Sequence, residues 1–252
     1  MKLSACIEWL FAEAGPDFAA RLRAAAAAGL PAVEFWRWRD KDLGAIAAAA
    51  ADTGTVVAGF CVEPWGELTD PASHQTWLRG VRESCAAAAQ LGVTNLITQV
   101  GPEQPGVDRA TQHEAVVVGL QLAAPILEGA GVTVLIEPLN TLVDHPGYYL
   151  SDTAEGIQIV REVASPAVGL IYDRYHAMVM GEPIGYGVEG NLDIVKHVHI
   201  ADAPGRHEPG TGGADWPAEL AWFRAQGYGG YFGLEYQPTG PSAQSLAYFA
   251  GL

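Results

Sequence analysis

Short apolar runs alternate along the chain with longer stretches rich in alanine and leucine. The short runs are nearly continuous in apolar residues, which is typical of parallel strands buried on both faces. The predicted strands are 2–7, 32–36, 55–62, 94–100, 132–138, 167–173, 195–202 and 230–236. The predicted helices are 16–29, 40–53, 72–91, 109–130, 152–163 and 216–226, with an ill-defined helical stretch near 175–194 and a short last helix within 241–252.

Turn residues divide this pattern into regular βα units. Gly92, Gly131 and Gly227 precede predicted strands, where a glycine ends the preceding helix. No linker rich in proline, glycine and serine divides the 252 residues. The pattern therefore predicts one domain over 1–252, a single (β/α)8 TIM barrel with a short C-terminal helix. Active sites of such barrels lie at the carboxyl ends of the strands, so catalytic residues are expected at those ends.

Composition narrows the classes of partner. With 49% hydrophobic residues the chain can bury a large core, and a net charge of −15 repels nucleic acid and anionic membranes. We find no apolar run of 18 residues free of charge, and no signal peptide. The cysteines, Cys6, Cys61 and Cys85, form neither a metal-binding pattern nor a disulfide framework. These features predict a cytoplasmic protein without a membrane span.

Ionisable residues stand at the carboxyl ends of four consecutive predicted strands. They are Glu137, Asp173, His199 and Glu235. Consecutive strands of a barrel bring such residues to one point, and three carboxylates with one imidazole suit a hard divalent cation. Without a cation the carboxylates would repel one another. The alternative is four separate, solvated charges on the rim. We expect one divalent ion, Mg²⁺ or Mn²⁺, with Co²⁺ as a further candidate.

Several motifs resemble the hydroxypyruvate isomerase family of xylose-isomerase-like barrels, which is related to sugar 3-epimerases and endonuclease IV. The motifs are AGLPAVEFW (28–36), VLIEPLNT (134–141), PGYYL (146–150), YDRYH (172–176), HIADAPGRHEPGTG (199–212) and GYFGLEYQP (230–238). The resemblance implies that Glu137 and Glu235 are paired catalytic glutamates and metal ligands. It implies that Asp173 and His199 complete the metal site, that His176 contacts a substrate oxygen, and that Arg206 binds an anion or hydroxyl of the substrate.

Two further residues have alternative interpretations. Asn140 either forms a hydrogen bond near the metal and substrate or stabilises the loop after residue 138. His207 either contacts substrate or fixes the glycine-rich loop around it. We include both among the candidate substrate-binding residues.

Three departures from the family pattern bear on the substrate. Members of the family often carry glutamine where this chain has His199, whereas the sugar epimerases carry histidine. The stretch CVEPWGELTDPASHQ (61–75) replaces the usual glycine- and aspartate-rich stretch, and Gly213 stands where glutamate is common. With these changes the fold and a complete set of metal ligands are still expected, since histidine also binds a divalent cation, but the motifs do not fix the substrate.

The leading hypothesis is a divalent-metal-dependent isomerase that interconverts hydroxypyruvate and tartronate semialdehyde, or a related hydroxy-keto acid, by proton transfer through an enediolate. Arg206 favours an acid over a neutral sugar, because its planar fork matches a carboxylate. A ketose 3-epimerase or other sugar isomerase is the first alternative. A non-catalytic metal-binding barrel that serves as a partner subunit is an alternative of another class. The expected partner is a small molecule, and formation of a homo-oligomer is left open.

Overall fold

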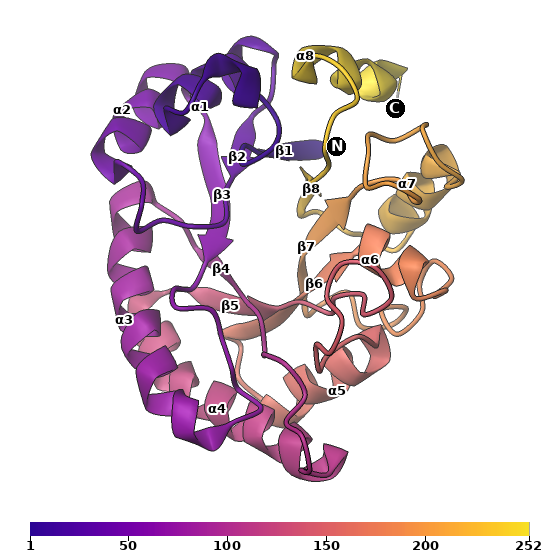
Figure 1. The fold of residues 1–252 in the computed structure, drawn as a ribbon. Helices are drawn as coiled ribbons and strands as arrows, with labels where there is room; N and C mark the ends of the chain where they lie inside the picture. Colours follow the sequence, from indigo (N-terminus) through magenta and orange to yellow (C-terminus); the bar gives the residue numbers. More distant parts are fainter. Residues whose placement is uncertain (252) are drawn as a thin grey trace.

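Eight parallel strands close into a barrel in the computed structural model, which describes residues 1–251 (Figure 1). The strands are β1 (Lys2–Cys6), β2 (Ala32–Glu34), β3 (Val56–Cys61), β4 (Asn95–Thr98), β5 (Thr133–Ile136), β6 (Val168–Asp173), β7 (Val195–Ile200) and β8 (Tyr231–Leu234). The helices are α1 (Phe18–Ala27), α2 (Leu43–Thr53), α3 (His74–Leu91), α4 (Arg109–Ala130), α5 (Thr153–Val163), α6 (Arg174–Val179), α7 (Trp216–Ala225) and α8 (Ser242–Ser245). The strand order follows the chain, and β8 pairs with β1 to close the barrel.

The predicted (β/α)8 fold is confirmed, with small corrections at its ends. The ill-defined stretch near 175–194 is helical only as α6, because glycines with positive φ at 181, 185, 187 and 190 end and follow it. The last helix is a short α8 continued by a 3-10 turn, Leu246–Gly251. Leu252, the last residue of the predicted domain and of that helix, lies outside the described residues.

Aspartates begin most of the helices. Asp17, Asp42, Asp108, Asp152 and Asp215 each accept a hydrogen bond from a backbone N–H in the first turn of the helix that follows. This contact satisfies one of the four free N–H groups at a helix start and places negative charge at the positive end of the helix dipole. A sizeable part of the acidic composition therefore stabilises helix starts.

The barrel interior has two chemically different sides. Cys61, Ile97, Leu135 and Ile171 form an apolar cluster on the side of β3 to β6. Across from it, buried polar residues project from β1, β2 and β7, namely Ser4, Glu34, His197 and His199. The larger apolar core lies elsewhere, in a separate cluster that includes residues of both strands and helices. The buried strand residues thus include both an apolar cluster and a polar group.

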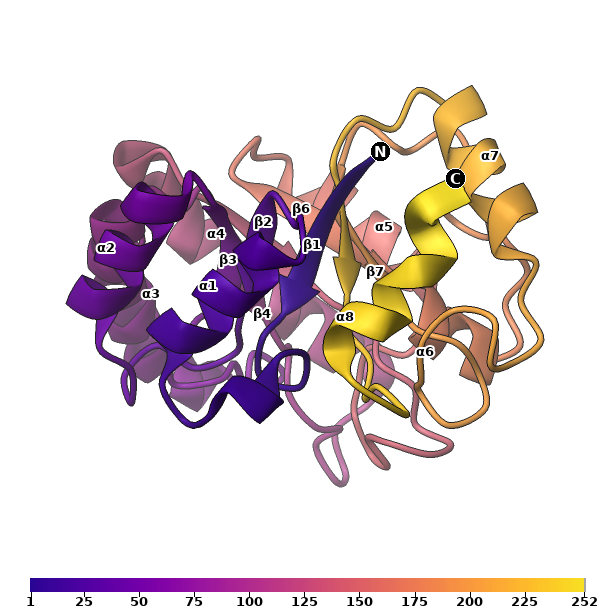
Figure 2. The same ribbon diagram turned by 90° about the horizontal axis from the view of Figure 1, so that it is seen from above.

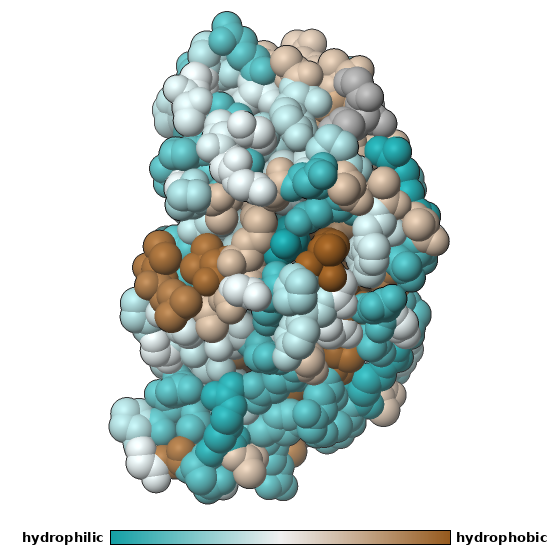
Figure 3. All heavy atoms as spheres, turned by 90° about the vertical axis from the view of Figure 1, so that its right-hand side faces the viewer, coloured by the Kyte–Doolittle hydropathy of each residue, from teal (hydrophilic) through white to brown (hydrophobic). Residues whose placement is uncertain are grey.

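The face of the molecule drawn in Figure 3 is mostly polar. Figure 3 shows one face, on which hydrophilic residues predominate and hydrophobic residues form a few separate groups. Within residues 1–251, no helix has the length and apolar character that a membrane crossing requires. Figure 2 shows β1 and β8 side by side, with their arrowheads at the same end of the barrel. The carboxyl ends of the strands meet at that end.

Candidate active site

A cavity of about 700 Å³ opens at the carboxyl ends of the strands. Its wall includes five aromatic residues, Trp9, Trp36, Trp65, Tyr148 and Tyr175, and its polar lining includes Glu137, His176, His199, Arg206 and Glu235. A concave site with aromatic walls and a few convergent polar groups is the usual form of a small-molecule site. Five of the eight predicted site residues therefore line one cavity.

The four predicted metal ligands converge. Glu137 directly follows β5, Asp173 ends β6, His199 lies in β7, and Glu235 directly follows β8. Each offers one ligand atom, and these atoms all lie within 4.8 Å of one another. The side chains are buried, with exposed fractions of 2–6%. Strand ends that lie far apart in sequence thus supply one compact cluster.

Nδ1 of His199 is the point on which the carboxylates converge. It lies 3.1 Å from Glu137 Oε1, 3.4 Å from Glu235 Oε2 and 3.7 Å from Asp173 Oδ2. One nitrogen can donate only one hydrogen, so it cannot satisfy three carboxylates by hydrogen bonding. Mg²⁺ holds ligands at about 2.0–2.1 Å, which places neighbouring ligand atoms about 3 Å apart. The donor set and its spacing fit a divalent cation.

Crowding of the carboxylates alters their protonation. Burial, reinforced by the Glu235 and Asp173 charges, raises the pKa of Glu137 to about 7 even though His199 acts to lower it. Although burial alone would raise it, the nearby His176, His199 and Arg206 hold the pKa of Asp173 well below its usual value. A carboxyl that titrates near neutrality is suited to take up and return a proton. Glu137 has this property and lines the cavity.

Arg206 contacts the cluster of candidate metal ligands directly. Its Nη2 donates to Glu235 Oε2 at short range and lies 3.6 Å from Asp173 Oδ2. The guanidinium carbon also lies 5.0 Å from the ring centroids of both Trp9 and Tyr175, within cation–π distance. The guanidinium is therefore already paired with site carboxylates. The prediction that it binds a substrate anion stays a prediction, and any such contact would be shared with Glu235.

The loop after β7 places Arg206 through a buried carboxylate. Asp202 accepts hydrogen bonds from Gly210 N and Gly212 N through Oδ2 and from Ala203 N through Oδ1, at 2.8–3.1 Å. A Cβ at Gly212 would lie 2.5 Å from Asp202 Oδ1, so only glycine fits there. Arg206 itself has φ 55°, in the left-handed region that non-glycine residues rarely adopt. The aspartate and the glycines of the motif around Arg206 thus fix the shape of the loop that carries it.

His176 lines the cavity, and Asn140 contacts its ring. Its Nδ1 lies 2.7 Å from Asn140 Nδ2 and accepts from Asn140 N, while its Nε2 lies 3.6 Å from Asp173 Oδ2. Burial lowers the pKa of His176 to about 4. Asn140 is fully buried, does not line the cavity, and also bonds Asp144. Asn140 thus contacts both the loop after β5 and His176, and its role in substrate binding stays a prediction.

His207 does not line the cavity either. Its Nδ1 lies 2.7 Å from the backbone oxygen of Gln237, which connects the loop after β7 to the segment after β8. This contact agrees with the interpretation that His207 fixes the glycine-rich loop. Its role as a substrate contact remains untested.

Two residues of the cavity wall, Trp9 and His145, were not predicted as site residues. Trp36 stands at the end of a predicted strand, a position that allows it to line the pocket, and its Nε1 donates to Glu235 Oε1 at 2.6 Å. Trp9 packs edge-on against Trp36, with centroids 4.9 Å apart. His145 lies in the long loop after β5 and lines the cavity, its ring centroid 5.4 Å from that of His176. No motif marks the histidine, because its position depends on how that loop folds.

Comparisons with known proteins agree with the resemblance seen in the motifs. A family model described as a xylose isomerase-like TIM barrel matches residues 22–251. A solved structure of an AP endonuclease, family 2, from Brucella melitensis is 31% identical, with a TM-score of 0.92 and coverage of 99% of this chain and 98% of that chain. Hydroxypyruvate isomerase of Escherichia coli strain K12 is 29% identical over 94% of each chain. The 2-oxo-tetronate isomerase of Cupriavidus necator is 29% identical over 92% of this chain and 91% of the relative.

Proposed function

Because the chain belongs to the xylose isomerase-like TIM-barrel family, we propose that it is a divalent-metal-dependent isomerase of a small hydroxy-keto acid. The substrate pair is hydroxypyruvate and tartronate semialdehyde, or a close relative such as a 2-oxo-tetronate. The names of the curated relatives support an isomerase of this substrate class. One observation carries the proposal, namely the convergence of Glu137, Asp173 and Glu235 on Nδ1 of His199 at a cavity wall.

The proposed chemistry divides between the cation and the protein. Glu137, Asp173, His199 and Glu235 would hold the ion, which as a Lewis acid would make the C–H beside the substrate carbonyl more acidic. Glu137, whose pKa lies near neutrality, would accept that proton and return it to the adjacent carbon. Arg206 and Trp36 would hold the Glu235 carboxylate in place through their two contacts. The aromatic wall would limit access of water.

A ketose 3-epimerase is the second candidate. Glu137 and Glu235 come from β5 and β8, on different sides of the barrel, and both line the cavity. Two bases on different sides can remove a proton from one face of a carbon and return it to the other. Arg206 in the cavity wall is paired with carboxylates, which also admits a neutral substrate. The non-catalytic alternative is set aside, because the curated relatives are isomerases.

Proton exchange in D₂O tests the proposed function. Hydroxypyruvate, tartronate semialdehyde, a 2-oxo-tetronate and common ketoses would each be followed by ¹H NMR with Mg²⁺ or Mn²⁺ added. We expect loss of the C–H signal beside the carbonyl of a hydroxy-keto acid, only with enzyme and metal together. Exchange confined to C3 of a ketose would establish the epimerase instead, and exchange independent of metal would refute the metal-dependent proposal.

The Arg206→Lys variant separates acidic from neutral substrates. Lysine keeps the charge but loses the planar fork, so KM for hydroxy-keto acids should rise by about 5- to 150-fold, equivalent to roughly 1–3 kcal/mol for a charge-assisted hydrogen bond. KM for a neutral ketose should change far less. Steady-state kinetics on both substrate types would check this. An equal rise in KM for both would mean that Arg206 acts only through Glu235.

A further inference from the structure

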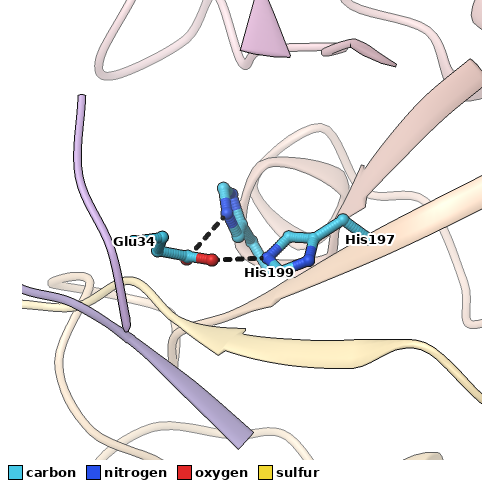
Figure 4. A group of neighbouring side chains, drawn as sticks. All are labelled: Glu34, His197 and His199. Atoms are coloured by element: carbon cyan, nitrogen blue, oxygen red, sulfur yellow. Dashed lines mark ion pairs between the residues drawn. The ribbon is translucent and has the colours of Figure 1, made fainter. Parts of the chain in front are cut away.

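A second group of buried polar side chains lies beside the proposed metal site, inside the barrel. The Glu34 carboxylate faces two imidazoles (Figure 4): its Oε2 lies 2.8 Å from His197 Nε2, and its Oε1 lies 3.1 Å from His199 Nε2. Ser4 Oγ also donates to Oε2, at 3.0 Å. All four residues are at most 4% exposed. Each carboxylate oxygen therefore faces one histidine.

Room for this group comes from a glycine on β8. Gly233 pairs with His199 across the sheet, and a Cβ at Gly233 would lie 2.4 Å from Glu34 Oε1 and 2.5 Å from His197 Nε2. It would also lie 2.7 Å from Cδ2 of His199. Real Cβ atoms do not approach other atoms so closely. The absent side chain is thus what lets Glu34 reach both imidazoles.

We propose that Glu34 is a positioning residue that holds His199 with its Nε2 hydrogen toward Glu34 and its Nδ1 lone pair toward Glu137, Asp173 and Glu235. This inference rests on the proposed metal site. A neutral imidazole carries one hydrogen, and an acceptor at one nitrogen fixes the hydrogen there and frees the other nitrogen as a ligand. Nδ1 of His199 is the nitrogen that faces the three carboxylates.

His197 has a different part in this arrangement. It lies two residues before His199 on β7, its ring meets that of His199 edge-on with centroids 4.9 Å apart, and it is absent from the cluster of four proposed ligands. Its Nε2 and Ser4 Oγ both lie within 3.0 Å of Glu34 Oε2, the carboxylate oxygen that does not face His199. Glu34, His197 and His199 also lie close enough together to hold a second cation. Anomalous scattering from Mn²⁺ crystals separates that arrangement from the positioning role.

The Glu34→Gln variant tests the proposal through metal affinity. Glutamine keeps the shape but has a single oxygen, which cannot accept from two imidazoles placed as His197 and His199 are. We expect the Kd for Mn²⁺, measured by calorimetry, to rise about 10- to 100-fold, the usual effect of losing such an outer partner. Ser4→Ala is the matched control, because it removes a hydrogen bond to the same carboxylate without touching His199, and its Kd should stay within about threefold of wild type. An unchanged Kd in folded Glu34→Gln would overturn the proposal.

A measurement on the unmodified protein keeps the proposal testable if that variant does not fold. With ¹⁵N-labelled histidine and saturating Mg²⁺, we expect NMR to show the hydrogen of His199 on Nε2 and none on Nδ1. A hydrogen on Nδ1 would overturn the proposal. So would anomalous scattering from Mn²⁺ crystals that shows a second ion between Glu34 and His197. If wild-type protein binds no Mn²⁺, the proposed metal site itself fails. If wild type binds and Glu34→Gln binds equally well, only the positioning role fails.

Discussion

Turnover should fall about 10²- to 10⁴-fold in the Glu137→Gln variant, the usual loss when a general base is removed. In the Glu235→Gln variant turnover should also fall, because a charged ligand of the cation is lost and the enediolate is less well stabilised. Glutamine retains the side-chain shape and one oxygen ligand, so each variant should keep part of its metal affinity. In an isomerase with a single base that moves the proton, one variant alone should abolish exchange of the substrate C–H in D₂O, and the proposed mechanism makes Glu137→Gln the expected one.

The pattern of exchange also identifies the reaction class. For an epimerase with one base on each face, each variant should still exchange the proton of one epimer and fail on the other. Glu114→Gln is a control. Glu114 lies on α4, is exposed and does not line the cavity, so this variant removes one negative charge outside the site and should exchange the substrate proton like wild type. Wild-type exchange in both site variants, with metal bound, would show that neither glutamate is the base.

Removal of divalent cations should destabilise the protein as well as stop its turnover. Three buried carboxylates remain close together when the cation leaves, and burial together with the Glu235 and Asp173 charges raises the pKa of Glu137. Mn²⁺ at about 100 times its Kd should stabilise the fold by about 2.7 kcal/mol, or roughly 5–10 °C in Tm for a chain of this size. Thermal unfolding in EDTA and in excess Mn²⁺ would measure the shift.

An Asp173→Asn variant provides the comparison for that experiment. It removes one ligand charge from the cluster and should reduce both the repulsion in EDTA and the stabilisation by Mn²⁺. Glu114→Gln should show the full wild-type shift. A Tm that does not respond to Mn²⁺ in wild type, or that responds equally in Asp173→Asn, would contradict the assignment of these ligands.

The barrel and the cluster of candidate metal ligands can be predicted from the sequence, because both depend on the pattern of apolar and polar residues within each βα unit. Apolar runs mark the strands, and in a barrel of parallel strands the residue at the end of each run points to one shared place. Glu137 and Glu235 lie one residue beyond the last residue of β5 and β8, so the predicted strands were slightly too long, but the ends were correctly located. The predicted runs continue past the last hydrogen bond between neighbouring strands. A pattern of hydrophobicity cannot show where these hydrogen bonds end.

The contacts of Arg206 and Glu34 could not be predicted in the same way. Arg206 reaches Glu235 because of a left-handed backbone at Arg206 and a loop held by Asp202, and neither has a local signal. Glu34 reaches His199 because Gly233, 199 positions later in the chain, carries no side chain. His145 depends on the fold of the long loop after β5. Each of these contacts requires the three-dimensional arrangement.

The loop held by Asp202 bears on how the enzyme would meet its substrate. The Asp202 carboxylate accepts hydrogen bonds from backbone amides of the same loop, and Asp202 is fully buried. The segment that carries Arg206 therefore takes its shape when the chain folds. Ordering a residue's backbone loses about 1–2 kcal/mol of conformational entropy. The conformational entropy of this loop is lost once, when the chain folds, and is not lost again each time a substrate binds. The arginine is therefore preorganised, and binding affinity is not diminished by having to order this part of the site.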